Sequence, residues 1–331
     1  MFGCAADATG EVARELRLAG RGVRLIYAGA AMMDAQFASF AHVEADLRQK
    51  PDLTVHIWDS HSTGTAAPAL PPTRGDNEVR GTLYYFGDAT VKAAYQPGTD
   101  TLSVFDSASG EAWYWTNDAR ELPYWDRAEP IRQILHWWLD SLGAQRLHAG
   151  AVGTEAGGVV IVGKSGSGKS TTALSSLDSP LGYAGDDCIA VVTQPEPFVY
   201  SLYNTGKLHP GHLERFEELR PTVSNPGVLD YEKAIVYIHE HFPEKTSAGF
   251  PLSAVLLPTI TGGETRLVPV SPATGLAALA PSTILQLPPI EPRAFAAMAR
   301  LVEQVPSYRL ELGPDVRRIP GVILDLIEQL T

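Results

Sequence analysis

The sequence predicts an α/β domain built around a central sheet, preceded by a mixed α+β domain. After residue 145, short apolar segments separated by glycine-rich turns alternate with helical segments, which is typical of α/β domains. Before about residue 130, short β-branched and aromatic segments accompany a helical segment. A length of 331 residues also favours two domains. We therefore predict an α+β domain over residues 1–140 and an α/β domain over residues 141–331.

The N-terminal domain is expected to contain a helix and four short strands. Residues 34–48 carry apolar side chains at helical spacing. The four expected strands are DLTVHIW (52–58), VRGTLYYF (79–86), TLSVF (101–105) and EAWYW (111–115). Residues 63–78 are rich in Pro and Gly and are expected to form an exposed loop. No motif in this domain indicates its role.

Tryptophan is concentrated between the two predicted domains. Trp113, Trp115, Trp125, Trp137 and Trp138 are five of the six tryptophans in the chain. They could line an aromatic ligand pocket, or they could pack a strand against the helix expected over 130–143 where the two halves meet. Packing is favoured because large aromatic side chains dominate protein cores.

Composition and charge exclude several classes of partner. The formal net charge of −12 argues against general affinity for nucleic acid or anionic membranes, which it would repel. No apolar run approaches the roughly 18 residues of a membrane span, and Asp7 and Glu11 interrupt the region where a signal peptide would be apolar. Cys4 and Cys188 lie far apart without metal-ligand neighbours, which favours a reducing compartment. We therefore expect a cytoplasmic protein without nucleic-acid or membrane partners.

The second domain is predicted element by element from the same patterns. The expected strands are RLHAGAV (146–152), GVVIVG (158–163), YAGDDCIAVV (183–192), AIVYIH (234–239), PLSAVLLP (251–258), TRLVPV (265–270) and YRLEL (308–312). The expected helices are KSTTALSSL (169–177), PRAFAAMARLVEQV (292–305) and PGVILDLIEQL (320–330).

A glycine-rich loop connects the second of these strands to the first helix. Residues 163–170 read GKSGSGKS and match the pattern G-x-x-x-x-G-K-[ST] in full. A buried strand directly before the loop and a helix directly after it are the context that this pattern requires. The glycines let successive backbone N–H groups turn toward phosphate oxygens, and the helix N-terminus adds a partial positive charge. The loop therefore predicts a nucleoside triphosphate site.

Individual residues of the loop have separate expected roles. Lys169 would reach the β- and γ-phosphates, and the Ser170 hydroxyl would hold Mg²⁺. The expected nucleotide-binding residues are Gly163, Lys164, Ser165, Gly166, Ser167, Gly168, Lys169, Ser170 and Thr171. The predicted cofactors are ATP and Mg²⁺.

An acidic pair, Asp186 and Asp187, follows the loop after only one predicted helix. The pair interrupts or begins the next strand, on the side where the loop opens. Adjacent side chains in a strand point to opposite faces, so one carboxylate can meet the metal while the other faces an incoming hydroxyl group. His148 begins an earlier strand. A histidine there is more often structural, but its joint spacing with Lys169 and Asp186 favours a role at the same site.

The segments LHAGAV, VVIVGKSGSGKSTTAL and GYAGDDCIAVV, within residues 146–192, resemble the HPr kinase/phosphorylase family. The resemblance is stronger to divergent bacterial serine kinases of this type that are encoded beside peptide-modification genes. Members carry an upstream histidine, a strand, such a loop, one helix, and an Asp-Asp pair before an apolar run. The resemblance implies a compact α/β nucleotide-binding domain related to phosphoenolpyruvate carboxykinase.

The resemblance also implies roles for individual residues. His148, Asp186, Asp187 and Lys169 become the catalytic group, with one aspartate acting as base toward a serine hydroxyl. Ser170 and Asp187 become the metal ligands. The family's downstream Glu-x-Arg-Gly-x-Gly signature is missing, since the corresponding region reads FVYSLYNTGKLHPGHLERF (198–216). This departure argues against HPr as the substrate and against the phosphorylase half-reaction, and which aspartate is the base stays open.

Other candidates for chemistry are fewer. Lys207, Lys233 and Arg266 could neutralise phosphate charge. His209 and His212 lack further ligands at the spacing of a zinc site. The sequence contains no G-x-S-x-G, C-x-x-C or H-E-x-x-H motif, which argues against the commonest hydrolases, redox proteins and zinc proteases.

These features predict an enzyme, a Mg²⁺- and ATP-dependent phosphotransferase that transfers the γ-phosphoryl group to a hydroxyl. By resemblance, the acceptor is a serine of a small protein or precursor peptide, and a sugar or amino acid is an alternative. A non-transferring ATPase that assists a partner enzyme also stays open, because it would need the same acid, metal and lysine. The sequence leaves the oligomeric state open, including a homo-oligomer.

Overall fold

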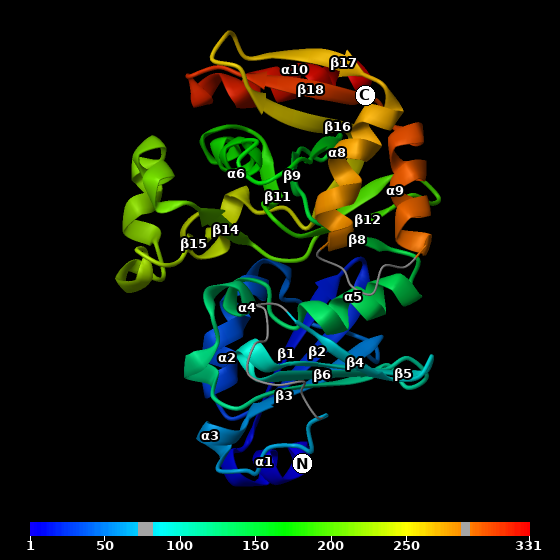
Figure 1. Ribbon diagram of the computed structural model, residues 1–331, viewed down its shortest axis with the longest axis vertical. Helices are drawn as coiled ribbons and strands as arrows, with labels where there is room; N and C mark the ends of the chain where they lie inside the picture. Colours follow the sequence, from blue (N-terminus) through cyan, green and yellow to red (C-terminus); the bar gives the residue numbers. More distant parts are fainter. Residues whose placement is uncertain (72–81, 286–291) are drawn as a thin grey trace. The chain divides into compact units, whose positions relative to one another are not determined.

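The computed structural model describes residues 1–71, 82–285 and 292–331 (Figure 1). They divide into two compact units, Met1–Leu142 and Gly143–Thr331. Each unit is a mixed α/β structure with a large sheet, as the sequence predicts for the chain as a whole. The predicted loop over 63–78 lies outside the described residues from residue 72 onward, and so do the first three residues of the strand predicted over 79–86.

The described part of the first unit forms one sheet with the strand order β1-β2-β3-β7-β6-β5-β4. Its strands are β1 (Glu11–Leu18), β2 (Arg21–Ala28), β3 (Leu53–Asp59), β4 (Tyr84–Gly87), β5 (Val91–Gln96), β6 (Thr101–Asp106) and β7 (Glu111–Thr116). The pairs β2–β3 and β3–β7 are parallel, and the other neighbours are antiparallel. The helices are α1 (Phe2–Thr9), α2 (Ala31–Gln36), α3 (Ser60–Thr63), α4 (Tyr124–Ala128) and α5 (Arg132–Ser141).

The helix predicted over 34–48 is wrong in its extent. Helix α2 ends at Gln36, and a 3₁₀ helix, η1 (Phe37–Val43), follows it. The buried Ser39 hydroxyl donates to the Arg127 carbonyl at 2.7 Å, a contact with a distant segment that sequence periodicity cannot contain. Tighter 3₁₀ turns are common where a helix ends.

Trp115 packs in the core of the first unit. It is 1% exposed, belongs to a cluster with Trp58 and Tyr95, and its Nε1–H donates to Ser60 Oγ at 2.9 Å. Trp137 is also buried. These contacts favour packing over an aromatic ligand pocket for these two side chains.

The second unit contains the larger sheet, with the strand order β11-β9-β10-β16-β13-β12-β8 and with β18 and β17 added beside the end of β16. Its strands are β8 (Gln145–Leu147), β9 (Gly150–Gly153), β10 (Gly158–Ile161), β11 (Gly182–Gly185), β12 (Ile189–Val192), β13 (Phe198–Ser201), β16 (Gly249–Ile260), β17 (Arg266–Val270) and β18 (Ser307–Leu312). The long strand β16 runs parallel to both β10 and β18.

Helices cover both faces of this sheet, as Figure 1 shows. Helices α6 (Lys169–Leu174) and α10 (Ile319–Leu330) contribute to one core, and α8 (Pro272–Leu285) and α9 (Pro292–Gln304) contribute to the other. Because side chains alternate across a strand, Val159 and Val160 of β10 enter different cores. The apolar run VVIV is buried because both of its faces are covered.

Strands β14 (Thr205–Leu208) and β15 (Ala234–Tyr237) form a separate antiparallel pair, and α7 (Ile238–His241) follows them. The connection between the two strands, residues 209–233, contains the 3₁₀ helices η5 (Pro210–Arg215), η6 (Glu217–Thr222) and η7 (Pro226–Val228), which Figure 1 draws in lime green. Leu213, Phe216 and Leu219 anchor this connection in the core that contains α6.

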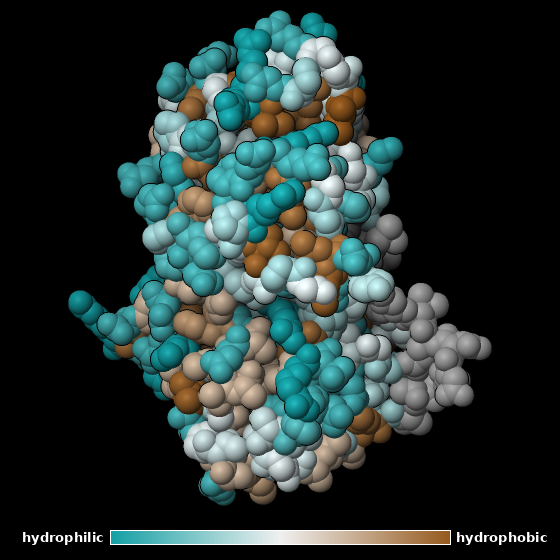
Figure 2. All heavy atoms as spheres, turned by 90° about the vertical axis from the view of Figure 1, so that its left-hand side faces the viewer, coloured by the Kyte–Doolittle hydropathy of each residue, from teal (hydrophilic) through white to brown (hydrophobic). Residues whose placement is uncertain are grey.

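Within residues 1–71, 82–285 and 292–331, no helix is both long and apolar enough to cross a bilayer. On the face drawn in Figure 2, hydrophobic side chains lie in patches among hydrophilic ones.

Candidate functional site

The glycine-rich loop lies between β10 and α6, so the strand and the helix expected on either side of it are both present. Gly163, Gly166 and Gly168 have φ values of 142°, 78° and 110°, in the region that favours glycine. A Cβ on Gly168 would lie only 2.4 Å from Leu312 Cδ1 on β18. The loop therefore needs glycine at residue 168 for two reasons, backbone conformation and close packing.

The predicted nucleotide-binding residues form one continuous segment, the loop and the first turn of the helix that follows it. Residues 163–168 make the loop, and Lys169, Ser170 and Thr171 open α6. Lys169 Nζ donates to the Gly163 carbonyl at 2.8 Å, which holds the ammonium group over the loop. Burial lowers the pKa of Lys169, while the charges of Asp187 and Asp186 partly restore it. Ser167 Oγ is buried and has no hydrogen-bond partner in the described structure.

The aspartate pair does not lie within a strand. Residues 183–192 form parts of two strands, β11 and β12, and Asp186 and Asp187 lie in the bend between them. Strand β11 pairs with β9, whereas β12 pairs with β8 and β13, so the chain changes position in the sheet at the pair. The prediction that strand geometry separates the two carboxylates was therefore wrong, and their different hydrogen bonds separate them instead.

Asp186 is almost completely buried, at 1% exposure. Its Oδ2 accepts the Lys207 backbone N–H at 2.9 Å, and its Oδ1 has no hydrogen-bond partner among the described residues. Burial, and then the charge of Asp187, raise the pKa of Asp186 to about 6 from an ordinary 3.8, although the Lys207 N–H and the nearby Ser170 hydroxyl favour the carboxylate. One carboxylate oxygen is thus left without a partner beside Ser170.

Asp187 is held by two basic side chains. Its Oδ2 accepts from Lys207 Nζ at 3.0 Å, and its Oδ1 lies 3.3 Å from His148 Nε2. Burial raises the pKa of Asp187, but the charges of Lys207, His148 and Lys233 outweigh burial and leave this pKa below its ordinary value. Asp187 is also the more accessible of the pair, since 21% of its side chain is exposed.

His148 lies in a short break between β8 and β9 rather than at the start of a strand. Its backbone N–H donates to the Thr283 hydroxyl of α8 at 3.2 Å, which fixes the break to the neighbouring helix. The structure thus brings His148 to Asp187, as its spacing in the sequence suggests.

The three other candidate cations have different surroundings. Lys207 is 5% exposed and contacts both aspartates, one through its backbone and the other through its ammonium group. Lys233 is partly buried, and its charge affects the pKa values of Lys169 and Asp187. Arg266 instead pairs with Glu311 at 2.7 Å and is 67% exposed. The sequence predicts Lys207 only as a candidate to neutralise phosphate charge, because a lysine in the short segment TGKL gives no signal of a contact with the aspartates.

The donor set suits magnesium better than zinc. Among the described residues, no group of three or more His, Cys, Asp or Glu side chains could hold a metal ion. Mg²⁺ binds through one or two carboxylates together with substrate phosphates and water, and needs no such cage. The unpartnered Asp186 Oδ1 beside the Ser170 hydroxyl fits that requirement, and the loop fits a phosphate chain.

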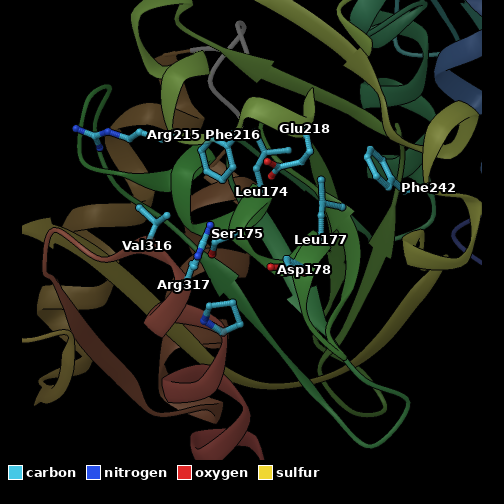
Figure 3. Close-up of a pocket in the computed structure, with 11 residues that line it drawn as sticks. Leu174, Ser175, Leu177, Asp178, Arg215, Phe216, Glu218, Phe242, Val316 and Arg317 are labelled. Atoms are coloured by element: carbon cyan, nitrogen blue, oxygen red, sulfur yellow. The ribbon is translucent and has the colours of Figure 1, made fainter. Parts of the chain in front are cut away.

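A separate pocket of about 400 Å³ lies near the other end of α6 (Figure 3). Its lining includes η4 (Ser175–Asp178) and η9 (Val316–Arg318). The lining residues are Leu174, Ser175, Leu177, Asp178, Arg215, Phe216, Glu218, Phe242, Val316, Arg317 and Pro320. None of the predicted site residues lines this pocket, so it is distinct from the loop and the aspartate pair.

Comparisons with known proteins give little further information. No family model matches the sequence, and no curated protein matches it. Among solved structures, the chain is similar to the Hpr(Ser) kinase/phosphatase from Coxiella burnetii, with 14% sequence identity and a TM-score of 0.32 over 56% of this chain and 95% of that chain. A TM-score this low supports no conclusion about function, so we infer the function from the residues of this chain.

Proposed function

We propose that this protein is a Mg²⁺- and ATP-dependent kinase that transfers the γ-phosphoryl group of ATP to a hydroxyl group. The observation that carries this proposal is the convergence of the glycine-rich loop and the aspartate pair, where Ser170 approaches the buried, partly unpartnered carboxyl group of Asp186. The acceptor that we propose is a serine of a protein or peptide, from the motif resemblance over residues 146–192.

The surroundings of the two aspartates support different roles. We assign the metal to Asp186 and Ser170, because Asp186 has the oxygen without a partner and lies beside the hydroxyl that would share the ion. We assign the acceptor to Asp187, because it is more accessible and both of its oxygens are already oriented by Lys207 and His148. This reverses the sequence-based prediction that paired Ser170 with Asp187 at the metal.

The remaining residues bind and orient. Bound Mg–ATP supplies the transferable phosphoryl group and neutralises part of its charge. The loop backbone binds phosphate oxygens, and Lys169 lies over the loop where the terminal phosphates would be. Asp187 accepts a hydrogen bond from the acceptor hydroxyl and takes its proton as the phosphoryl group moves. Because phosphoryl transfer needs little nucleophile activation, a carboxylate of low pKa can act mainly by orienting the hydroxyl.

Incubation of the protein with γ-labelled ATP and Mg²⁺ tests the proposal, with separate panels of serine peptides, sugars and amino acids as acceptors. Mass spectrometry should find the label on a peptide serine. Label on a sugar or amino acid would keep the kinase and change its acceptor, whereas label only in inorganic phosphate would indicate an ATPase.

The Lys169→Ala variant is the control for this assay. It should lose transfer while weak nucleotide binding by the loop backbone survives, because the terminal phosphates lose the lysine that faces them. Unchanged turnover in this variant would exclude the glycine-rich loop as the nucleotide site.

A further inference from the structure

Lys233 lies beside the strand that contacts the aspartates. It directly precedes β15, whose first residue, Ala234, pairs with Leu208, the neighbour of Lys207 on β14. The antiparallel register therefore brings the end of the 209–233 connection next to the strand end that carries Lys207. A lysine far along the chain is placed close to the candidate site in this way.

A side-chain clamp fixes the backbone at this lysine. Asn225 Nδ2 donates to the Lys233 carbonyl at 2.9 Å, and Asn225 Oδ1 accepts the Ile235 N–H at 2.8 Å. The Ser224 N–H donates to the Ile235 carbonyl at 2.9 Å, which is a third hydrogen bond to the segment 233–235. The position of Lys233 is therefore built into the fold, even though it lies at the end of a long connection.

The ammonium group of Lys233 has no anionic partner among the described residues. No ion pair or hydrogen bond joins it to another described side chain, although the residue is partly buried. Its charge lowers the pKa of Lys169 and also that of Asp187, so it lies near both groups. Asp187 is already held by Lys207 and His148, and therefore Lys233 is a surplus positive charge.

Surplus positive charge at this place is unusual for the chain. Lys169, Lys207 and Lys233 all interact electrostatically with Asp187, in a protein with a net charge of −12. Two lysines that approach each other repel, and an anionic ligand between them would remove that cost. The cluster is thus suited to a ligand with more negative charge than the aspartate pair supplies.

We propose that Lys233, positioned by Asn225, binds the terminal phosphate group of a bound nucleoside triphosphate. This inference rests on the proposed function and adds to it a residue that distinguishes a triphosphate from a diphosphate. Lys169 holds the phosphate chain from the loop side, and Lys233 meets its end from the β14–β15 side.

Calorimetric binding of a non-hydrolysable ATP analogue and of ADP, both with Mg²⁺, tests the inference without any turnover. Lys233→Met should weaken analogue binding about 10-fold or more, as expected for loss of a charge-assisted contact, and should leave ADP binding nearly unchanged. Lys233→Arg should retain most of the analogue affinity, because it keeps the charge. Asn225→Ala should lower the preference for the triphosphate partly, since the lysine is kept but its support is lost.

Arg220→Met is the matched control, because it removes an exposed positive charge from the same connection. It should bind both nucleotides like the wild type. Equal weakening of ADP and analogue by Lys233→Met, or no change in either, would overturn the inference alone. Binding of neither nucleotide by the wild type would overturn the proposed function together with it. If Lys233→Met fails to fold, the ratio of analogue affinity to ADP affinity in the Asn225→Ala and Lys233→Arg variants decides instead.

Discussion

At the scale of single residues, Lys207 organises the candidate site. Its backbone N–H donates to Asp186 and its ammonium group donates to Asp187, so one buried residue contacts both carboxyl groups. Asp186 keeps a raised pKa and an unpartnered oxygen, whereas Asp187 stays charged. Groups whose surroundings separate their pKa values in this manner are common at functional sites.

The two aspartates should respond differently to neutralisation. Asp187→Asn should reduce phosphoryl transfer by roughly 10²- to 10⁴-fold, the usual range for a general base, while ATP affinity changes only a few fold. Asp186→Asn should raise the Mg²⁺ concentration needed for half-maximal activity, because it removes a metal oxygen. Separate measurements of nucleotide binding, metal dependence and transfer check this. If both variants keep full transfer, the pair has only a structural role.

The raised pKa of Asp186 predicts a pH dependence of stability in the absence of added metal. The Asp186 carboxyl group has a pKa of about 6 in the folded state, against an ordinary 3.8. Its contribution to the free energy of unfolding of the wild type therefore falls as the pH rises from about 4 to about 6. Asparagine carries no such penalty and can still accept the Lys207 N–H. Asp186→Asn should therefore melt at a higher temperature than the wild type above pH 6, and the difference should shrink toward pH 4.5. A difference that is constant with pH would contradict the raised pKa.

At the scale of elements, the glycine-rich loop depends on the strand packed beside it. Gly168 lies against Leu312 of β18, which enters the sheet from the far end of the chain. The loop conformation is therefore supported by the sheet as well as by its own glycines. This packing helps to hold the phosphate-binding backbone at positive φ values, which residues other than glycine adopt only with a loss of conformational free energy.

Two glycine variants separate these contributions. Gly168→Ala should destabilise the protein by about 1–3 kcal/mol and weaken ATP binding, because it combines an unfavourable φ with a contact to Leu312. Gly166→Ala should cost less, since its Cβ would meet nothing within 4 Å. Thermal unfolding and calorimetry measure both effects. Adding Leu312→Ala to Gly168→Ala should recover ATP affinity in part. An equal loss of stability and ATP affinity in Gly168→Ala and Gly166→Ala would argue against the packing explanation.

At the scale of the whole molecule, the proposed site lies entirely within the second of the two compact units. Every residue assigned to it falls between His148 and Lys233, while the first unit has its own sheet and core. A ligand that binds only the folded state stabilises the elements around its site.

Hydrogen exchange should reveal this division. Mg–ATP should slow amide exchange in residues 163–171 and at Lys207, whereas β5 and β6 of the first unit should exchange as before. Mass spectrometry of peptides with and without Mg–ATP checks the pattern. Protection confined to the first unit would place the nucleotide elsewhere.

Features that depend on neighbouring residues of the chain could be predicted for the second unit. The loop, its preceding strand and the start of its following helix form as predicted, because glycine spacing, an apolar run and a helix start are properties of adjacent residues. The helix predicted over 169–177 is wrong in its extent, since α6 ends at Leu174 and η4 follows it. The extents of longer segments were less predictable. Residues 34–48 and 183–192 depart from their predicted elements because distant partners, Arg127 for Ser39 and strands β8, β9 and β13 for the aspartate region, compete with local preference.

The contacts between the candidate residues depend on the folded path of the chain and could not be predicted from local patterns. Lys207 reaches both aspartates because β14 leaves the main sheet and pairs with β15, and no pattern within the sequence sets that direction. The different surroundings of Asp186 and Asp187 follow from burial and from charged side chains that are distant in the sequence, so adjacent and chemically identical residues acquire different properties. Lys233 joins them through the Asn225 clamp, since hydrogen bonds across a 209–233 connection depend on the path of the folded chain.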